Sequence, residues 1–194
     1  MTLQLTKKHS FNLVFDSQII YRMILEAMSN PGKIVSLQKY EKKLYGDDPG
    51  LLAVALTLLD NEVSFYVFGN DSLSDEISSL THAEPDGIKS ADFIFVRDQN
   101  DLKLAIENAK YGTLDDPHKS ATVIIQNDNV PSQHTTLSGP GIEGRSGHMF
   151  TQTVTDAIMI RDTLNFEYPL GIDFFFISCM GDFLAIPRLV KVVE

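Results

Sequence analysis

The chain has 194 residues, of which 43% are hydrophobic and 22% are charged, and its formal net charge is −10. These values are typical of one compact domain with a sizeable core, and they exclude a globally disordered chain. The acidic balance disfavours binding to nucleic acid or to a membrane surface, because attraction to phosphate supplies most of the affinity for nucleic acid.

The first elements are predicted between residues 16 and 60. Residues 16–29 have apolar side chains at helical spacing beside a narrow polar stripe, which predicts a mostly buried helix with Asp16 or Ser17 at its N-terminal cap. The stretch SNPG ends this helix, and KIVSL is typical of a short strand. A second helix is predicted from Pro49, and its apolar residues cover nearly every face, so deep burial is expected.

Strands and helices alternate through the middle of the chain. The stretches EVSFYVF, ADFIFV and ATVIIQ are predicted strands, while DSLSDEISSLTH and QNDLKLAIENAKYG, closed by Gly112, are predicted helices. A strand is also predicted for QHTTLS, a loop for GPGIEGRSG, and a helix capped by Thr155 for TDAIMIRDTLNF. The stretches IDFFFISCM and FLAIPRLVKV flank Gly181 and Asp182, which predicts a hairpin.

This order of elements favours an α/β fold. Alternating strands and helices predict a parallel core, and the hairpin at the end of the chain adds antiparallel strands. We therefore expect a mixed sheet with helices on both faces.

The N-terminus and the single cysteine favour a soluble, cytoplasmic protein. The first residues, MTLQLTKKHSFNL, lack the apolar core of a signal peptide, and no stretch has the length of a transmembrane helix. Cys179 cannot form an internal disulfide, which suits a reducing compartment. Its position at the end of an apolar strand predicts a buried structural thiol.

Three glycines repeat the G-x-G-x-x-G spacing of dinucleotide-binding loops, namely Gly139, Gly141 and Gly144. The surroundings differ from that motif, because Pro140 lies inside it and no helix is predicted to begin at Gly144. A simple glycine turn is therefore favoured. An alternative stays open, in which the backbone amides of the turn or Arg145 bind a phosphate or a partner.

No catalytic residue or metal site is predicted. The histidines are scattered without metal-type spacing, although His148 lies close in sequence to Arg145 and the glycines. The stretch GRSGH does not match the G-x-S-x-G motif of hydrolases. The lysines lie mostly in polar stretches, which disfavours a Schiff-base site for pyridoxal phosphate.

One carboxylate, Asp173, stands immediately before three phenylalanines in YPLGIDFFF. An ionised group beside a buried strand is costly unless it is paired. Arg188 lies in the apolar stretch LAIPR, and the predicted hairpin brings it near Asp173. Two alternatives are open: a structural ion pair at the sheet edge, or a site that binds an anion or another subunit.

Five stretches together resemble the PhnH family of the bacterial carbon–phosphorus lyase system. They are YRMILEAMSNPGKIVSL (21–37), LTLLDNEVSF (56–65), LSGPGI (137–142), YPLGIDFFFI (168–177) and LAIPRLVKV (184–192). Their order and spacing match across nearly the whole chain, so residues 1–194 are expected to form a single PhnH-like domain.

The resemblance implies a three-layer α/β/α fold like that of pyridoxal-phosphate-dependent transferases, but without the cofactor. It also implies a homodimer that joins subunits of the PhnG, PhnI and PhnJ types. That assembly converts ATP and methylphosphonate into alpha-D-ribose 1-methylphosphonate 5-triphosphate, and a later radical step carried by PhnJ breaks the carbon–phosphorus bond.

The resemblance implies no catalytic residue for this subunit, so we expect an accessory role in a transferase-type complex. An alternative is a subunit that binds a nucleotide or a phosphonate in a pocket of its own. In that case the pocket is expected around Gly139, Gly141, Arg145, Asp173 and Arg188.

Overall fold

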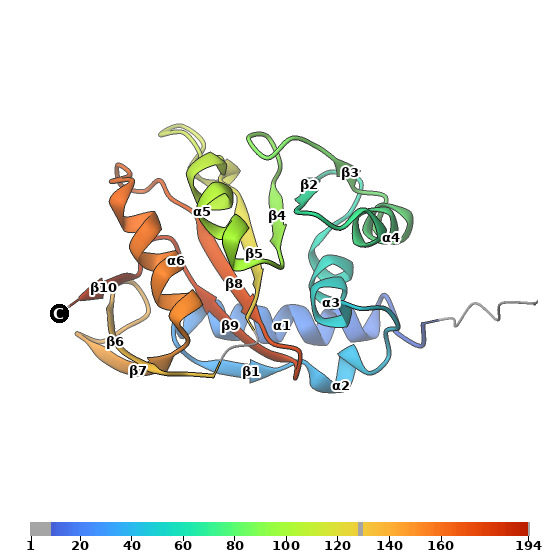
Figure 1. The fold of residues 1–194 in the computed structure, drawn as a ribbon, viewed down its shortest axis with the longest axis horizontal. Helices are drawn as coiled ribbons and strands as arrows, with labels where there is room; N and C mark the ends of the chain where they lie inside the picture. The colour runs from blue at the N-terminus through green and yellow to red at the C-terminus, as the bar shows by residue number, and fades with distance from the viewer. Residues whose placement is uncertain (1–8, 128–129, 194) are drawn as a thin grey trace, which may run out of the picture.

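The computed structural model describes residues 9–127 and 130–193, and it contains two sheets (Figure 1). The larger has the strand order β1-β9-β8-β5-β4-β2-β3 and the smaller the order β10-β6-β7. The strands of the larger sheet are β1 (Ile34–Ser36), β2 (Ser64–Val67), β3 (Glu84–Pro85), β4 (Phe93–Val96), β5 (Thr122–Gln126), β8 (Asp173–Ile177) and β9 (Asp182–Ile186). Those of the smaller are β6 (Gln133–Ser138), β7 (Ser146–Phe150) and β10 (Lys191–Val193).

Helices connect the strands and pack on the larger sheet (Figure 1). They are α1 (Phe15–Ser29), α2 (Gln38–Glu41), α3 (Pro49–Leu58), α4 (Asp71–Thr81), α5 (Gln99–Asn108) and α6 (Gln152–Thr163), with a 3-10 turn at Pro117–Lys119. None of the helices in the described part of the chain is both long and apolar enough to span a bilayer.

The larger sheet is mixed, as predicted. Strands β3, β2, β4, β5 and β8 run parallel, whereas β9 is antiparallel to β8 and β1 is antiparallel to β9. Phe174 lies opposite Ile186 in the β8–β9 pair, which confirms that a hairpin forms. Asp182 belongs to β9 and not to the turn, and the predicted second strand ends at Ile186, so that Lys191–Val193 joins the smaller sheet as β10. The antiparallel strands thus extend a parallel core on one side.

Two hydrophobic cores lie on the two faces of this sheet. The first combines buried residues of α1, α3 and α4 with the sheet, and the second combines those of α5 and α6. The three phenylalanines of β8 divide between them, because successive side chains of a strand point to opposite faces. Phe175 belongs to the first core, and Phe174 and Phe176 belong to the second. The predicted α/β fold with helices on both faces is therefore confirmed, while its likeness to pyridoxal-phosphate-dependent transferases stays a prediction.

The first helix differs from its prediction at its start and on its outer face. It begins at Phe15, and the side chain of Asn12 accepts the backbone N–H groups of Val14 and Phe15. Asp16 lies inside the helix, where its carboxylate accepts the backbone N–H of Asn12 at 2.8 Å and two hydrogen bonds from Lys43 Nζ at 2.7 and 2.8 Å. Ile19 is 42% exposed, so the expectation of a mostly buried helix is wrong.

Smaller corrections concern α5, α6 and the β8–β9 turn. Helix α6 is capped by Thr151, whose hydroxyl accepts the N–H of Val154 at 3.3 Å, and not by Thr155. Helix α5 ends at Asn108, ahead of Gly112. Cys179 is exposed, because it lies in the turn after β8 and not within the strand.

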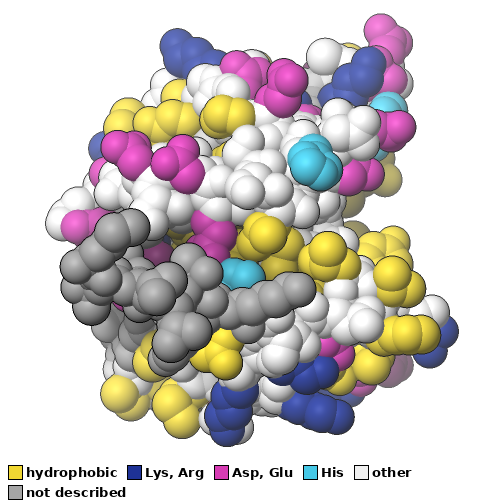
Figure 2. All heavy atoms as spheres, turned by 90° about the vertical axis from the view of Figure 1, so that its right-hand side faces the viewer, with side chains coloured by type: hydrophobic (Ala, Val, Ile, Leu, Met, Phe, Trp, Pro, Cys, Tyr) yellow, Lys and Arg dark blue, Asp and Glu magenta, His cyan; other side chains and the backbone are white. Residues whose placement is uncertain are grey.

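The end of the molecule where α1 begins carries several groups of exposed hydrophobic side chains (Figure 2). Leu13, Val14 and Phe15 lie at the start of α1 and are 56–71% exposed. Lys and Arg side chains stand at the rims of this face, and acidic side chains lie between them (Figure 2). The described part of this face therefore offers no continuous basic surface for a polyanion.

Candidate functional site

Four of the five stretches that resemble the PhnH family meet in one region. The glycine loop, which we define as residues 139–145, connects β6 to β7 and packs against the turn after α1 and the turn after β9. A Cβ atom on Gly141 would lie 2.9 Å from the carbonyl oxygen of Ser29, and one on Gly139 would lie 2.8 Å from that of Leu189. These glycines therefore allow backbone segments to approach each other closely.

The packing of Gly139 and Gly141 supports a structural role, while the alternative in which the loop binds a phosphate or a partner stays a prediction. Strand β7 begins at Ser146, so no helix follows the loop and the dinucleotide motif is absent, as predicted. Gly139 and Gly141 face neighbouring backbone, which gives them a structural role in this conformation. Arg145 is exposed at the far end of the loop and does not line the pocket described below.

Replacing Gly141 with alanine is expected to reduce the free energy of unfolding by about 2 kcal/mol, because the loop cannot approach Ser29 and because φ is positive at this residue. Gly144→Ala is the matched control, since Gly144 also has positive φ but has no neighbouring atom within 4 Å of its Cβ position. It should cost only about 1 kcal/mol. Urea denaturation measures both, and equal losses would contradict the close-approach explanation.

Asp173 and Arg188 form the ion pair that their sequence positions suggested. Asp173 stands at the start of β8 with its side chain 10% exposed, and Arg188 follows β9 with its side chain 21% exposed. One carboxylate oxygen of Asp173 accepts the backbone N–H of Arg188 at 2.7 Å, and its two oxygens accept Nε and Nη2 of the guanidinium. Nη1 donates to the carbonyl oxygen of Pro117 at 2.5 Å. The pair therefore joins β8, the turn after β9 and the 3-10 turn.

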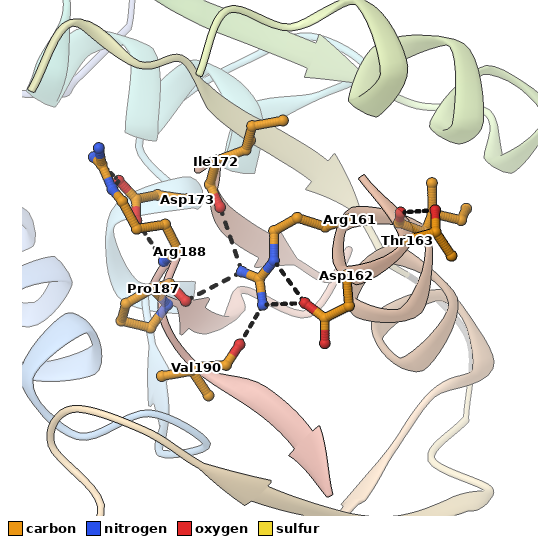
Figure 3. Close-up of polar contacts among 9 residues, drawn as sticks. Arg161, Asp162, Thr163, Ile172, Asp173, Pro187, Arg188 and Val190 are labelled. Carbon is orange, nitrogen blue, oxygen red and sulfur yellow. Dashed lines mark hydrogen bonds and ion pairs between the residues drawn. The ribbon is translucent and has the colours of Figure 1, made fainter. Parts of the chain in front are cut away.

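A second arginine, Arg161 on α6, lies beside this pair and was not predicted (Figure 3). It is only 1% exposed, and its Nη1 donates to the carbonyl oxygens of Ile172 and Pro187 at 3.3 and 3.1 Å. Nη2 donates to the carbonyl oxygen of Val190, and the guanidinium lies 5.1 Å from the centre of the Phe174 ring. Arg161 thereby holds α6 against the start of β8 and the end of β9.

The charge of Arg161 is only loosely balanced by a carboxylate. Its nearest carboxylate, Asp162, accepts Nε and Nη2 at 3.4 Å, which is a long contact. Burial lowers the pKa of Arg161, while Asp162 and the more distant Asp173 act in the opposite direction. The guanidinium remains protonated at neutral pH, because arginine begins from a very high pKa. The three backbone carbonyls therefore solvate a buried cation.

A pocket of about 380 Å³ opens beside these arginines. It is lined by Pro140, Arg161, Asp162, Asn165, Phe166, Tyr168, Leu170, Arg188, Leu189 and Lys191. Its volume is within the usual range for small-molecule sites. Of the predicted residues, the structure brings Arg188 to this pocket and places Asp173 directly behind it, while Pro140 brings the glycine loop to its edge.

The lining of this pocket is mixed in chemistry. It includes three cationic side chains and one carboxylate, with apolar and aromatic side chains between them. No cysteine, serine or histidine is among them, whereas Asp162, Tyr168 and Lys191 are of types that can transfer protons. Within residues 9–127 and 130–193, no group of three or more His, Cys, Asp or Glu side chains could hold a metal ion.

Comparison with known families identifies the family of this chain. A family model described as bacterial phosphonate metabolism protein (PhnH) matches residues 9–193. The chain belongs to the PhnH family. A curated relative, the putative C-P lyase subunit protein HtxG of Stutzerimonas stutzeri, is 26% identical over 162 residues, which cover 83% of this chain and 78% of the relative. The family resemblance predicted from the five stretches is therefore confirmed.

His148 of this PhnH-family chain has a packing role beside the glycine loop. Its ring lies directly against Gly32, where a Cβ atom would overlap it, and it stacks on Phe150 with 5.3 Å between ring centres. The buried Nε2 atom makes no hydrogen bond to a described residue. The ring thus connects β7 to the turn after α1, and it does not line the pocket with Arg188.

Burial lowers the pKa of His148 below its ordinary value of 6.5. The unfolded chain therefore takes up the proton more readily than the folded protein as the pH falls below 6.5, and the free energy of unfolding should decrease in that range. His148→Gln removes this titration and should flatten the curve of stability against pH. The control His118→Gln makes the same substitution at a side chain that is 75% exposed, away from the packed ring of His148. Denaturation at a series of pH values checks this, and parallel curves for His148→Gln and the unmodified protein would contradict it.

Proposed function

We propose that the chain is an accessory subunit of a carbon–phosphorus lyase complex. In this role it takes part in forming alpha-D-ribose 1-methylphosphonate 5-triphosphate from ATP and methylphosphonate. The match of the PhnH family model to residues 9–193 carries the proposal. The name of the relative HtxG, a putative subunit of C-P lyase, adds support.

The proposed partners are a second copy of the chain and subunits of the PhnG, PhnI and PhnJ types. Exposed apolar side chains at the start of α1 support a role in contacts with other chains, because apolar groups gathered on a surface often mark interfaces. Leu13, Val14 and Phe15 are the most exposed members of this group.

Co-purification tests the accessory role. A tagged chain expressed with the sibling subunits of its own organism should retain at least one of them through size-exclusion chromatography. The double variant Val14→Ser and Phe15→Ser should weaken this association or the self-association of the chain, whereas Leu104→Ser, at an exposed leucine of α5, serves as the control. A folded chain that associates with none of its siblings would overturn the proposal.

A second candidate function is that of a subunit that binds a nucleotide or a phosphonate itself. The pocket beside Arg188 favours it, since cationic side chains meet there on a strongly acidic chain. Calorimetry with ATP and with methylphosphonate tests this function. An absence of heat with both ligands, together with unchanged activity of the complex carrying Arg188→Ala, would remove it.

A further inference from the structure

The pocket beside Arg188 has an aromatic part and a cationic part. Phe166 and Tyr168 come from the connection between α6 and β8, while Arg188 and Lys191 come from the end of β9 and the start of β10. Phe166 is held by the ring of Tyr111, with 4.9 Å between the ring centres, and Tyr168 is 76% exposed. One wall of the pocket is therefore suited to a planar ring.

The cations of the pocket differ in what they can still bind. Arg161 gives its N–H groups to backbone carbonyls and to Asp162, so its role is structural. Arg188 uses Nε, Nη1 and Nη2 for Asp173 and Pro117, yet each Nη atom carries a second hydrogen. The backbone of Lys191 pairs with Ser138 of β6, but its exposed side chain forms no hydrogen bond or ion pair with another described residue. Two donors with available hydrogens, Arg188 and Lys191, thus lie in one pocket.

The polar groups of the pocket suit the edge of a ring. The carboxylate of Asp162 makes only long contacts to Arg161. Asn165 lies three residues further along the chain, and its side-chain amide donates to the carbonyl oxygen of Thr163. A carboxylate accepts hydrogen bonds from amino groups, and an amide can also donate to ring nitrogen atoms. They lie in the same lining as Phe166 and Tyr168.

We propose that this pocket binds a phosphomonoester attached to a planar heterocycle, the chemistry of a nucleoside monophosphate. Arg188 and Lys191 bind the dianion, Phe166 and Tyr168 stack on the ring, and Asp162 with Asn165 contact its edge. The volume of about 380 Å³ and the two available cations suit one phosphate group better than a triphosphate. The inference rests on the second candidate function, since it names the ligand class for that site.

Calorimetry with four probes and a set of variants tests the inference. The probes are adenosine monophosphate, which has both parts, ribose 5-phosphate, which lacks the ring, adenosine, which lacks the anion, and inorganic phosphate. We expect adenosine monophosphate to bind most tightly. Lys191→Gln should weaken its binding about tenfold and leave adenosine unaffected. Tyr168→Ala should weaken adenosine monophosphate and adenosine by roughly fivefold to a hundredfold.

The controls match each change in chemistry. Lys89→Gln removes the same charge at an exposed site between β3 and β4, and Tyr168→Phe keeps the ring. Both should bind adenosine monophosphate like the unmodified protein. The variants at Lys191 and Tyr168 alter exposed side chains, and urea denaturation verifies that they fold.

Three results would overturn the inference. The first is the absence of binding for every probe at millimolar concentration, and the second is binding that neither Lys191→Gln nor Tyr168→Ala changes. The third is tighter binding of ribose 5-phosphate than of adenosine monophosphate, which would reject the ring and leave an anion site. Co-purification with the sibling subunits is measured on the same samples. Association without binding of adenosine monophosphate rejects this inference and leaves the accessory role intact.

Discussion

Replacing Arg161 with methionine is expected to reduce the free energy of unfolding by about 3–5 kcal/mol. The side chain is nearly inaccessible and donates to the carbonyl oxygens of Ile172, Pro187 and Val190. Methionine fills a similar volume but donates no hydrogen bond, so these buried carbonyls lose their side-chain donor. Urea denaturation followed by circular dichroism measures the loss.

Arg161→Lys separates the charge from the forked geometry. Lysine keeps the cation, but its single ammonium group cannot reproduce the spread of donors that the planar guanidinium gives to the three carbonyls. We therefore expect most of the loss to remain. Arg22→Met on the exposed face of α1 is the control and should change stability by no more than about 0.5 kcal/mol. A loss below about 1 kcal/mol for Arg161→Met would mean that water replaces the guanidinium at these carbonyls.

The second large effect is expected at Asp173. Asp173→Ala should reduce the free energy of unfolding by about 3 kcal/mol, because it leaves the guanidinium of Arg188 and its backbone N–H without their acceptor. Asp173→Asn keeps one oxygen for the backbone N–H at 2.7 Å and should lose about half as much. Thermal and urea denaturation measure both variants.

A double-mutant cycle isolates the ion pair from the backbone contact. Arg188→Gln is combined with Asp173→Asn, and the coupling energy between them should be about 1–2 kcal/mol, a value limited by the partial exposure of Arg188. Coupling near zero would show that Asp173 acts through the backbone N–H alone. Co-purification of Asp173→Asn with the sibling subunits then tests whether assembly needs the ionised carboxylate.

The sheet was predictable because its strands carry local patterns. Three phenylalanines in a row indicate a strand that is buried on both faces, and Phe174, Phe175 and Phe176 divide between the two cores. The ion pair of Asp173 with Arg188 was one of two alternatives that the sequence left open, since a buried carboxylate needs a partner and the hairpin brings Arg188 near. The sequence does not decide between them, because the contacts of Arg188 depend on the turn after β9.

The pocket was less predictable because it depends on contacts distant in sequence. The sequence carries one indication that Arg161 is buried. It follows Val154, Ala157 and Ile158 at helical spacing, so it lies on the buried face of α6. Its acceptors, in contrast, are backbone carbonyls that no side-chain pattern reveals. The prediction that α1 is mostly buried failed for a related reason. Periodicity identifies the apolar faces of a helix, but it cannot distinguish a face packed in the core from one left open to a partner.

The pairing of β1 with β9 links the beginning of the described chain to its end. During synthesis on the ribosome, β1 emerges early and must wait for β9 before its hydrogen bonds can form, because translation adds only about 5–20 residues per second. The glycine loop likewise meets the β9–β10 turn only after Leu189 and Val190 have emerged. A nascent chain stopped before β8 therefore exposes an edge of β5 and the unfilled sides of both cores. Emergence of β8 and β9 is the step at which this sheet can close.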